Sequence, residues 1–369
     1  MRGVYIIMKK VFISPAKYIQ GAGVLETIGE EVSKIGKSAF ILADEIVWNI
    51  TGKLVEKSFN STEVTYHYEN FSGEASNTEI SRIANIGKEK NIDVVIGLGG
   101  GKTLDTAKAV SNELGVPIVV APTTASTDAP TSSLSVIYSD EGVFEGYKFY
   151  NKNPDLVLVD SQIIVGAPAF LFASGIGDAM ATLVEAKASQ KRNSTTMAGG
   201  KATLAGIAIA EKAEDVLFEQ GIAAFKAAKK GLVTPQVENV IEANTLLSGL
   251  GFENGGVAAA HAVHNGFTAL NGDIHKLTHG QKVAYGVLVQ LVLESKSEDE
   301  ILRYANFFKA IGLPTTLKDL HLENATFEDL VKVGELATAE GETIKNLDPE
   351  ITAVQVANAI QAVNELTAE

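Results

Sequence analysis

The sequence contains no cysteine and only nine prolines in 369 residues. The lack of cysteine excludes disulfides, thiolate zinc sites, iron–sulfur clusters and a cysteine nucleophile. Any metal ion must therefore be held by carboxylate and imidazole groups. Long apolar runs are absent too: stretches such as Val287–Leu293 fall far short of the about 20 residues that a bilayer requires.

Basic residues are also few: 31 Lys and Arg stand against 45 Asp and Glu, which gives a formal net charge of −14. This balance argues against nucleic acid or an anionic membrane as the main partner, because either would require a basic surface. The hydrophobic fraction of 46% is that of a globular protein, and the length suggests two domains.

The N-terminus has a short apolar patch, then Lys9 and Lys10, and no cleavage site. This pattern is not typical of a signal peptide. We expect a soluble, cytoplasmic protein in which residues 1–8 are a dispensable extension, with Met8 as an alternative start.

Short apolar runs alternate with segments of helical periodicity through the first half of the chain. Continuous apolar strands of this kind belong to a parallel sheet with helices on both faces. A turn at 139–142 between two further runs predicts a β-hairpin. The expected strands are 39–43, 64–68, 92–97, 116–121 and 155–159, the expected helices are 23–36, 77–90 and 102–114, and the hairpin strands are 135–138 and 143–150.

From Pro168 onward the chain consists of alanine-rich segments with a period of about 3.6 residues and hardly any strand pattern. The sequence therefore predicts an α/β domain at 1–166 and an all-helical domain at 167–369. The expected helices of the second domain are 174–190, 196–229, 235–250, 256–266, 280–294, 298–310, 327–340 and 350–367.

A glycine-rich turn, Gly99-Gly100-Gly101, joins an expected strand to an expected helix. Glycines at such a junction let the backbone approach a pyrophosphate, and the helix N-terminus offers free N–H groups. A tight turn without a ligand is the alternative, because glycine is the usual residue of strained turns. The spacing matches neither G-x-G-x-x-G nor a Walker loop.

Asp44 follows an expected strand and is the residue type that binds ribose hydroxyls and favours NAD over NADP. In the usual fingerprint this acid comes after the glycine loop, whereas here it precedes it. A cap of the next helix is an equally good interpretation.

A hydroxyl-rich loop, Pro122–Ser133, follows another expected strand, in the region where open α/β sheets bind ligands. Its hydroxyls suit phosphate contacts, and Asp128 suits a substrate hydroxyl. The alternative is a solvated loop of turn-forming residues.

Four of the six histidines lie between His261 and His279. His261 and His264 fall in an apolar, alanine-rich segment and are expected to project from a buried helix. Upstream, Asp178 is expected at the start of a helix, where an N-cap is the simpler interpretation. One aspartate with two histidines would form an oxygen and nitrogen donor set that suits zinc or ferrous iron.

Together, these motifs resemble the glycerol dehydrogenases of the metal-dependent alcohol dehydrogenase family that is often called iron-containing. The resemblance spans essentially the whole chain from Lys9 onward. It rests on long, ordered matches at 99–108, 122–131, 175–179, 248–256, 261–266 and 278–280.

The resemblance implies an N-terminal NAD-binding domain, a C-terminal all-α metal-binding domain and an active site in the cleft between them. It implies zinc at Asp178, His261 and His279, with iron or manganese as alternatives, and a polyol bound by Asp128. Asp128 and His261 are thus the expected catalytic residues. The residues expected to contact NAD are Asp44, Gly99, Gly100, Gly101, Lys102, Thr103, Thr123, Ser126, Ser132, Leu134 and Tyr138.

One departure separates subfamilies: iron-dependent members usually carry a further histidine one turn after the ligand aspartate, where this chain has Thr182. A three-ligand zinc site is the better fit. The implied reaction is the reversible oxidation of glycerol to dihydroxyacetone, in which the metal lowers the pKa of a substrate hydroxyl and NAD accepts hydride. His264 or His275 is a candidate proton relay.

Two other classes share parts of this pattern. A dehydroquinate synthase-like lyase or a glycerol-1-phosphate dehydrogenase would need basic residues for an anionic substrate, and Lys187, Lys191 and Arg192 lie outside the metal-site motifs. A non-catalytic protein with structural zinc would usually supply four protein ligands. The resemblance also implies a homo-oligomer, commonly an octamer.

Overall fold

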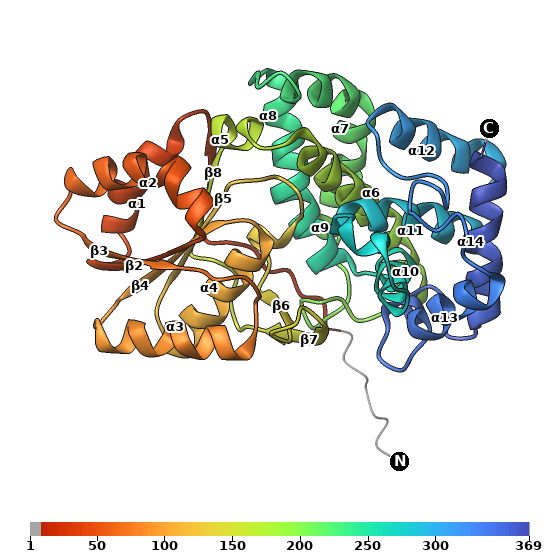
Figure 1. Cartoon of the computed structure of the whole chain (residues 1–369), viewed down its shortest axis with the longest axis horizontal. Coiled ribbons are helices and arrows are strands. Elements are labelled where there is room, and N and C mark those ends of the chain that lie inside the picture. The colour runs from red at the N-terminus through yellow and green to blue at the C-terminus, as the bar shows by residue number, and fades with distance from the viewer. Residues whose placement is uncertain (1–8, 369) are drawn as a thin grey trace, which may run out of the picture. The chain divides into compact units, whose positions relative to one another are not determined.

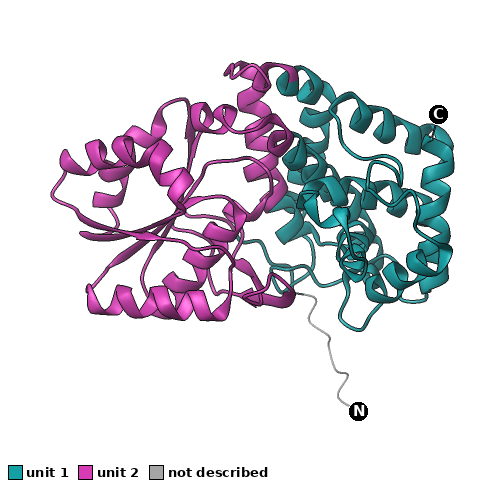
Figure 2. Cartoon of the chain, in the orientation of Figure 1, with its two compact units in different colours: residues 1–13, 173–225, 250–369 teal, residues 14–172, 226–249 magenta. Residues whose placement is uncertain are grey.

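The computed structural model describes residues 9–368, which divide into two compact units (Figure 1). Within these residues, a sheet unit comprises Ser14–Phe172 and Lys226–Gly249, and a helical unit comprises the rest; Figure 2 draws the first in magenta and the second in teal. The expected extension, residues 1–8, lies outside the described residues.

This division differs from a single boundary near residue 166. The change of unit falls at Ala173, inside helix α6 (Ala169–Arg192), and residues 226–249 return to the sheet unit. Helical periodicity reports that a segment is helical, but it does not report which unit that helix packs on.

A six-stranded parallel sheet forms the centre of the sheet unit, in the strand order β1-β8-β5-β4-β2-β3. A separate antiparallel hairpin, β6–β7, also matches the expectation. β1 has no counterpart among the expected strands, because its four residues are half-exposed and form no apolar run. The strands are β1 (Tyr18–Gly21), β2 (Ser38–Ala43), β3 (Thr65–Asn70), β4 (Val94–Gly99), β5 (Ile118–Pro122), β6 (Leu134–Tyr138), β7 (Phe144–Phe149) and β8 (Leu156–Asp160).

Helices cover both faces of the sheet, with α1 and α2 on one side and α3 on the other in Figure 1. Beneath α1 and α2, Ile28 and Val55 pack with the strand residues Ile41, Ile96 and Val119, all of them buried. The helices of this unit are α1 (Ile28–Ser33), α2 (Glu45–Asn60), α3 (Asn77–Glu89), α4 (Gly101–Leu114), α5 (Ser161–Gly166) and α8 (Pro235–Glu242), with a π-helical turn at Ala243–Leu247.

The chain reverses its direction of travel across the sheet between β2 and β4. It runs from β2 outward to the edge strand β3, returns to β4 on the other side of β2, and continues to β5. In open α/β sheets, ligands bind at such a switch point, outside the carboxyl ends of the strands. The ends of β2, β4 and β5 carry Asp44, Gly99 and Thr123, respectively.

Among the described residues after Asp160, every named element is a helix, as expected. One of them, α6, is long and apolar enough to cross a membrane by length and composition, but 83% of its apolar window is buried inside the structure, as in the core helix of a globular protein. The remaining helices are α7 (Leu204–Ala228), α9 (Ser248–Gly255), α10 (Ala259–Gly266), α11 (His279–Leu293), α12 (Glu298–Ala310), α13 (Phe327–Ala337) and α14 (Ala353–Thr367).

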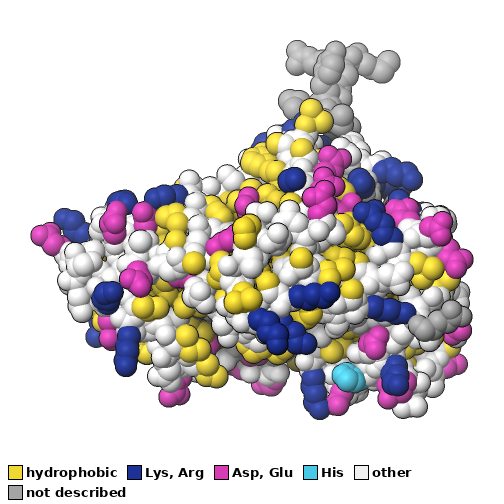
Figure 3. All heavy atoms as spheres, turned by 90° about the horizontal axis from the view of Figure 1, so that it is seen from above, with side chains coloured by type: hydrophobic (Ala, Val, Ile, Leu, Met, Phe, Trp, Pro, Cys, Tyr) yellow, Lys and Arg dark blue, Asp and Glu magenta, His cyan; other side chains and the backbone are white. Residues whose placement is uncertain are grey.

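Charged side chains of both signs are spread over the face shown in Figure 3. On that face, Lys and Arg side chains stand among Asp and Glu side chains, so neither sign covers it as a continuous field.

Candidate metal centre and nucleotide site

The glycine turn after β4 has the backbone geometry that a phosphate cradle requires. Gly99 has a φ of +157°, and a Cβ atom on it would lie 2.8 Å from Oγ1 of Thr103. Gly100 has no atom within 4 Å of its Cβ position, and Gly101 meets only Oγ1 of Thr127 at 3.6 Å. Helix α4 begins at Gly101 without a side-chain cap, so its first N–H groups face this open space.

Close packing beneath the turn fixes its position. A Cβ atom on Gly97 would lie 2.7 Å from Cβ of Ala107, so strand β4 and helix α4 approach each other closely. The buried side chain of Thr103 packs against Gly99. Thr123 donates its backbone N–H to the carbonyl of Gly99 at 3.0 Å, which places the next loop beside the glycines.

Asp44 serves as the N-cap of α2, because its Oδ1 accepts a hydrogen bond from the N–H of Val47 at 2.8 Å. The cap interpretation of the sequence is therefore confirmed, and ribose binding stays a prediction. Lys102 is half-exposed, pairs with Glu74 and lies 5.7 Å from the ring centre of Tyr138. The structure thus brings Lys102 and Tyr138, both predicted cofactor contacts, together.

The 129–134 loop is held from below by a buried lysine. Nζ of Lys108 pairs with Asp105 at 2.9 Å and donates to the carbonyls of Ala129 and Leu134. Ser132 is buried, and its hydroxyl donates to the carbonyl of Ala129. The loop is therefore a fixed structure and not a solvated run of turn formers, while cofactor contacts of Ser132 and Leu134 stay predictions. Thr124 and Ser126 join their hydroxyls at 3.0 Å.

Asp128, the predicted polyol-binding residue, is half-buried and accepts a hydrogen bond from the hydroxyl of Ser248 at 3.0 Å. Two neighbouring residues of the segment 226–249 bond to the same loop. Asn244 donates to the carbonyl of Ala125, and the carbonyl of Thr245 accepts a hydrogen bond from the hydroxyl of Thr131. The π-helical turn therefore supports the loop that carries Asp128. The sequence matched this segment to the family without assigning Ser248 a role.

In the helical unit, Asp178, His261 and His279 bring one ligand atom each to within 4.8 Å of one another. Oδ1 of Asp178 lies 3.1 Å from Nε2 of His279 and 3.5 Å from Nε2 of His261. Asp178 is buried, whereas the imidazoles are partly exposed. One carboxylate and two imidazoles form a donor set that fits a divalent ion such as zinc with an open coordination position.

Two glycines bring these ligands together. A Cβ atom on Gly280 would lie 1.9 Å from the carbonyl oxygen of Ser174, and one on Gly177 would lie 2.5 Å from the carbonyl oxygen of Gly280. Helices α6 and α11 therefore touch, backbone against backbone, beside Asp178 and His279. The expectation that Asp178 starts a helix, or caps one, is wrong, because α6 begins at Ala169 and passes through this contact.

A second carboxylate reaches His261 from its other side. The Nδ1 atom of His261 lies 2.6 Å from Oε2 of Glu185, whose side chain is 1% exposed. The other oxygen of Glu185 accepts the backbone N–H groups of Ala258 and His261. The sequence interpretation missed Glu185, although its place seven residues after Asp178 puts both acids on one face of an apolar helix.

The charges of the cluster stabilise one another. Burial alone would raise the pKa of the Asp178 carboxyl, but His279 and His261 outweigh it and hold that pKa below its ordinary value. Burial would likewise lower the pKa of His261, whereas Glu185 and Asp178 raise it well above its ordinary value. The site therefore binds positive charge beside an ionised carboxylate, and a metal ion would replace protons in that role.

Thr182 occupies the position where iron-type members carry a histidine. A Cβ atom on Gly251 of α9 would lie 2.4 Å from Cγ2 of Thr182, so the threonine is in tight contact with a neighbouring helix. A histidine ring at this position would push α9 away.

The remaining histidines differ in their surroundings. The ring of His264 lies 4.3 Å from that of His279, centre to centre, and burial together with His279 lowers the pKa of His264 well below its ordinary value. His264 also contacts Asn265, which in turn donates to Glu342. Nε2 of His275 bonds the carbonyl of Leu270 at 2.6 Å, which is a backbone role. A proton relay through either histidine stays a prediction.

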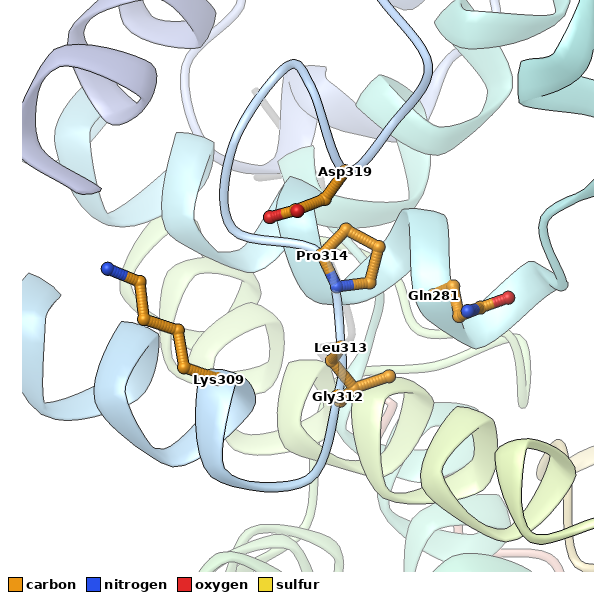
Figure 4. A pocket seen from close by; sticks show the side chains of 6 residues that line it. All are labelled: Gln281, Lys309, Gly312, Leu313, Pro314 and Asp319. Atoms are coloured by element: carbon orange, nitrogen blue, oxygen red, sulfur yellow. The ribbon is translucent and has the colours of Figure 1, made fainter. Parts of the chain in front are cut away.

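Two surface hollows do not include the metal ligands in their lining. One, of about 330 Å³ in the helical unit, is lined by Lys309, Asp319 and Gln281, which Figure 4 shows on different sides of it. Asp319 already accepts two backbone N–H groups, and Lys309 donates to a carbonyl. The other, of about 270 Å³, lies in the sheet unit at the end of α4, opposite the carboxyl ends of the strands.

Comparison with known proteins gives a consistent result. Residues 15–161 match the family described as iron-containing alcohol dehydrogenase. Glycerol dehydrogenase of Escherichia coli O6:H1 is 47% identical over 358 residues, which cover 97% of each chain. Glycolaldehyde reductase of Halobacterium salinarum is 45% identical over 359 residues, which cover 97% of this chain and 98% of the relative.

A solved structure extends the similarity to the fold. The crystal structure of glycerol dehydrogenase from Schizosaccharomyces pombe has a TM-score of 0.94 and 43% sequence identity, and the match covers 98% of this chain and 91% of that one. The glycine turn, the supported hydroxyl loop and the donor triad all lie within the matched length. By identity, coverage and fold, this chain belongs to the iron-containing alcohol dehydrogenase family.

Proposed function

We propose that this protein is an NAD-dependent dehydrogenase that oxidises glycerol to dihydroxyacetone and catalyses the reverse reaction. The observation that carries the proposal is the cluster of Asp178, His261 and His279, an open donor set in a chain that is 47% identical to a glycerol dehydrogenase. The lyase and phosphate-substrate alternatives have no comparable support among the relatives named above.

The metal ion that we propose for the cluster is zinc. Asp178, His261 and His279 would hold it, and the tight contact of Thr182 with α9 favours the three-ligand form over the iron type. When bound, the ion supplies Lewis acidity toward a substrate hydroxyl, and NAD supplies the hydride acceptor.

The chain's own residues orient the reactants. Asp128, fixed by Ser248, would accept a hydrogen bond from a polyol hydroxyl. The free N–H groups at Gly100 and Gly101 would bind the pyrophosphate, and the remaining carboxylate capacity of Asp44 would bind a ribose hydroxyl. Lys102 and Tyr138, which lie side by side, would contact the cofactor at the edge of the β6–β7 hairpin. We extend the same proposal to Gly99, Thr103, Thr123, Ser126, Ser132 and Leu134.

The test is NADH formation from a panel of diols. Enzyme stripped with a chelator is assayed by absorbance with glycerol, 1,2-propanediol, ethylene glycol and a primary alcohol, after zinc, iron or manganese is restored. The proposal expects diol-dependent NADH formation with zinc and glycerol. Absence of diol-dependent NADH under every metal would refute the dehydrogenase assignment.

A second substrate has specific support, because a relative of 45% identity is a glycolaldehyde reductase. Reduction of a hydroxyaldehyde is the same hydride transfer run in reverse. The two functions are separated by comparing kcat/KM for glycerol with NAD against kcat/KM for glycolaldehyde with NADH. A larger value for glycolaldehyde, corrected for the equilibrium constants, would favour the second assignment.

We further propose that the protein works in the cytoplasm as a soluble homo-oligomer, with the octamer that the family resemblance implies as the expected state. Light scattering coupled to size-exclusion chromatography measures the mass directly. A particle near the 39.0 kDa of one chain would contradict the oligomer.

A further inference from the structure

Glu185 is a buried acid that the proposed reaction leaves without a role. It lies on α6 two helical turns after Asp178, and its side chain is only 1% exposed. A carboxylate is seldom buried this deeply unless its oxygens are bonded. We propose that Glu185 is a positioning residue, which holds the imidazole of His261 with Nε2 directed at the metal; the inference rests on the metal centre of the proposed function.

The hydrogen bond to the ring fixes its tautomer. An ionised carboxylate only accepts hydrogen bonds, so the 2.6 Å contact between Oε2 of Glu185 and Nδ1 of His261 requires the proton on Nδ1. In the neutral ring that binds a metal ion, Nε2 then carries the lone pair, and Nε2 is the atom that lies 3.5 Å from Oδ1 of Asp178. A carboxylate bonded to the far nitrogen of a metal-bound histidine both orients the ring and increases its basicity.

The second oxygen of Glu185 fixes the backbone that carries the ring. Oε1 accepts the N–H groups of Ala258 and His261 at 2.9 and 3.0 Å. Helix α10 starts at Ala259 after Ala258, a residue whose side chain cannot cap it. One side chain therefore controls both the position of the His261 backbone and the rotation of its imidazole.

Gln290 provides a matched control, because it bonds the backbone at the start of α10 without bonding the ring of His261. Its buried Oε1 accepts the N–H groups of Ala259 and Ala260, in the same first turn of α10. Its amide nitrogen donates to the carbonyl of Val184 and to Glu294, away from the ring of His261. If Glu185 only stabilised the helix start, replacing either residue would have the same effect.

The decisive substitution is Glu185→Gln, which keeps the size of the side chain. An amide cannot satisfy both partners: if its oxygen faces the backbone N–H groups, its NH2 donates to Nδ1 and moves the ring proton to Nε2. If the amide is flipped, its NH2 group faces the two backbone N–H donors, and none of these donors has an acceptor. Either arrangement weakens His261 as a ligand.

The experiment measures zinc affinity by competition with a chromophoric chelator, together with the visible spectrum of the cobalt-substituted protein. We expect Glu185→Gln to lower zinc affinity by about 10- to 100-fold and to change the cobalt spectrum. Gln290→Leu should lower the unfolding temperature of the metal-free protein while leaving zinc affinity close to that of wild type, because Gln290 bonds the helix start and not the ring.

Asp178→Asn distinguishes a failure of the positioning role from a failure of the metal centre. If Asp178→Asn loses zinc while Glu185→Gln binds it like wild type with an unchanged cobalt spectrum, the positioning role is overturned and the metal centre stands. If Asp178→Asn also binds zinc normally, the metal centre itself is misassigned. Should Glu185→Gln fail to fold, Glu185→Asp keeps the charge but is too short to reach ring and backbone together. Wild-type zinc affinity in that variant would overturn the inference.

Discussion

Asp178 and Glu185 act on opposite sides of one imidazole from a single helix. Asp178 approaches Nε2 of His261, and Glu185 bonds Nδ1. The donor triad could be expected from the sequence, because the histidines are clustered and their motif resembles that of a known family. Glu185 could not be singled out as easily. Most carboxylates in helices are exposed, and the sequence alone does not show that this one is buried.

Loss of any one triad residue should remove the metal. Asp178→Asn, His261→Ala and His279→Ala are each expected to lower zinc affinity by more than the about 100-fold that losing an outer-shell partner costs. Equilibrium dialysis with metal analysis measures this. Asp273→Asn is the control, because Asp273 is exposed and pairs with Lys276 on the surface. If only the His261 variant lost zinc, the triad would be wrongly assigned.

The bond between Ser248 and Asp128 should affect the polyol and not the nucleotide. Ser248→Ala removes a hydrogen bond to a charged acceptor, which is worth about 1.5 kcal/mol or more, and about 1.4 kcal/mol corresponds to a tenfold change. We expect KM for glycerol to rise about tenfold, with NADH affinity unchanged by fluorescence titration. A parallel loss of NADH affinity would mean that the serine supports the whole loop and not Asp128 in particular.

The elements of the sheet unit follow local patterns, and those of the helical unit depend on close backbone contacts. Continuous apolar runs predicted β2, β4, β5 and β8, which are largely buried because both faces of that sheet are covered. The π-helical turn at Ala243–Leu247 and the contact of Gly177 with Gly280 have no periodic signature. Such contacts are set by partners distant in sequence, so a local pattern cannot reveal them.

The crossing of α6 and α11 predicts a sensitive glycine. Gly280→Ala would place a Cβ atom 1.9 Å from the carbonyl oxygen of Ser174, so the two helices must separate. We expect the free energy of unfolding in urea to fall by about 1–3 kcal/mol and zinc affinity to fall with it. Gly166→Ala is the control, because Gly166 has no atom within 4 Å of its Cβ position. Equal stability of the two variants would contradict the close contact.

At the scale of the whole molecule, buried tyrosines make stability depend on alkaline pH. Burial raises the pKa of Tyr150 to about 12 from an ordinary value of 10.0. It also raises the pKa of four other tyrosines that are more deeply buried than Tyr66 and Tyr68. These are Tyr18, Tyr138, Tyr285 and Tyr304. Because the unfolded chain ionises first, each tyrosine's contribution is complete below about pH 10. It is lost as the pH rises through the folded value.

We therefore expect the free energy of unfolding to fall steeply between about pH 10 and 12. Urea denaturation at pH 8, 10 and 11 measures this fall. Tyr150→Phe should reduce this loss of unfolding free energy by up to about 3 kcal/mol between about pH 10 and 12, because a pKa shift of two units corresponds to about that energy. A constant free energy of unfolding from pH 9 to 11.5 would contradict the assignment.

The return of residues 226–249 to the sheet unit bears on how the chain is made. As synthesis proceeds, the strands and glycine turn emerge first, but Asn244 and Ser248, which secure Ala125 and Asp128, follow more than a hundred residues later. The ribosome must therefore release all of α7 and the segment that follows it before the loop that carries Asp128 can take its final form. Early folding would yield a sheet with an unsecured loop, and a fragment cut after residue 172 would keep that defect permanently.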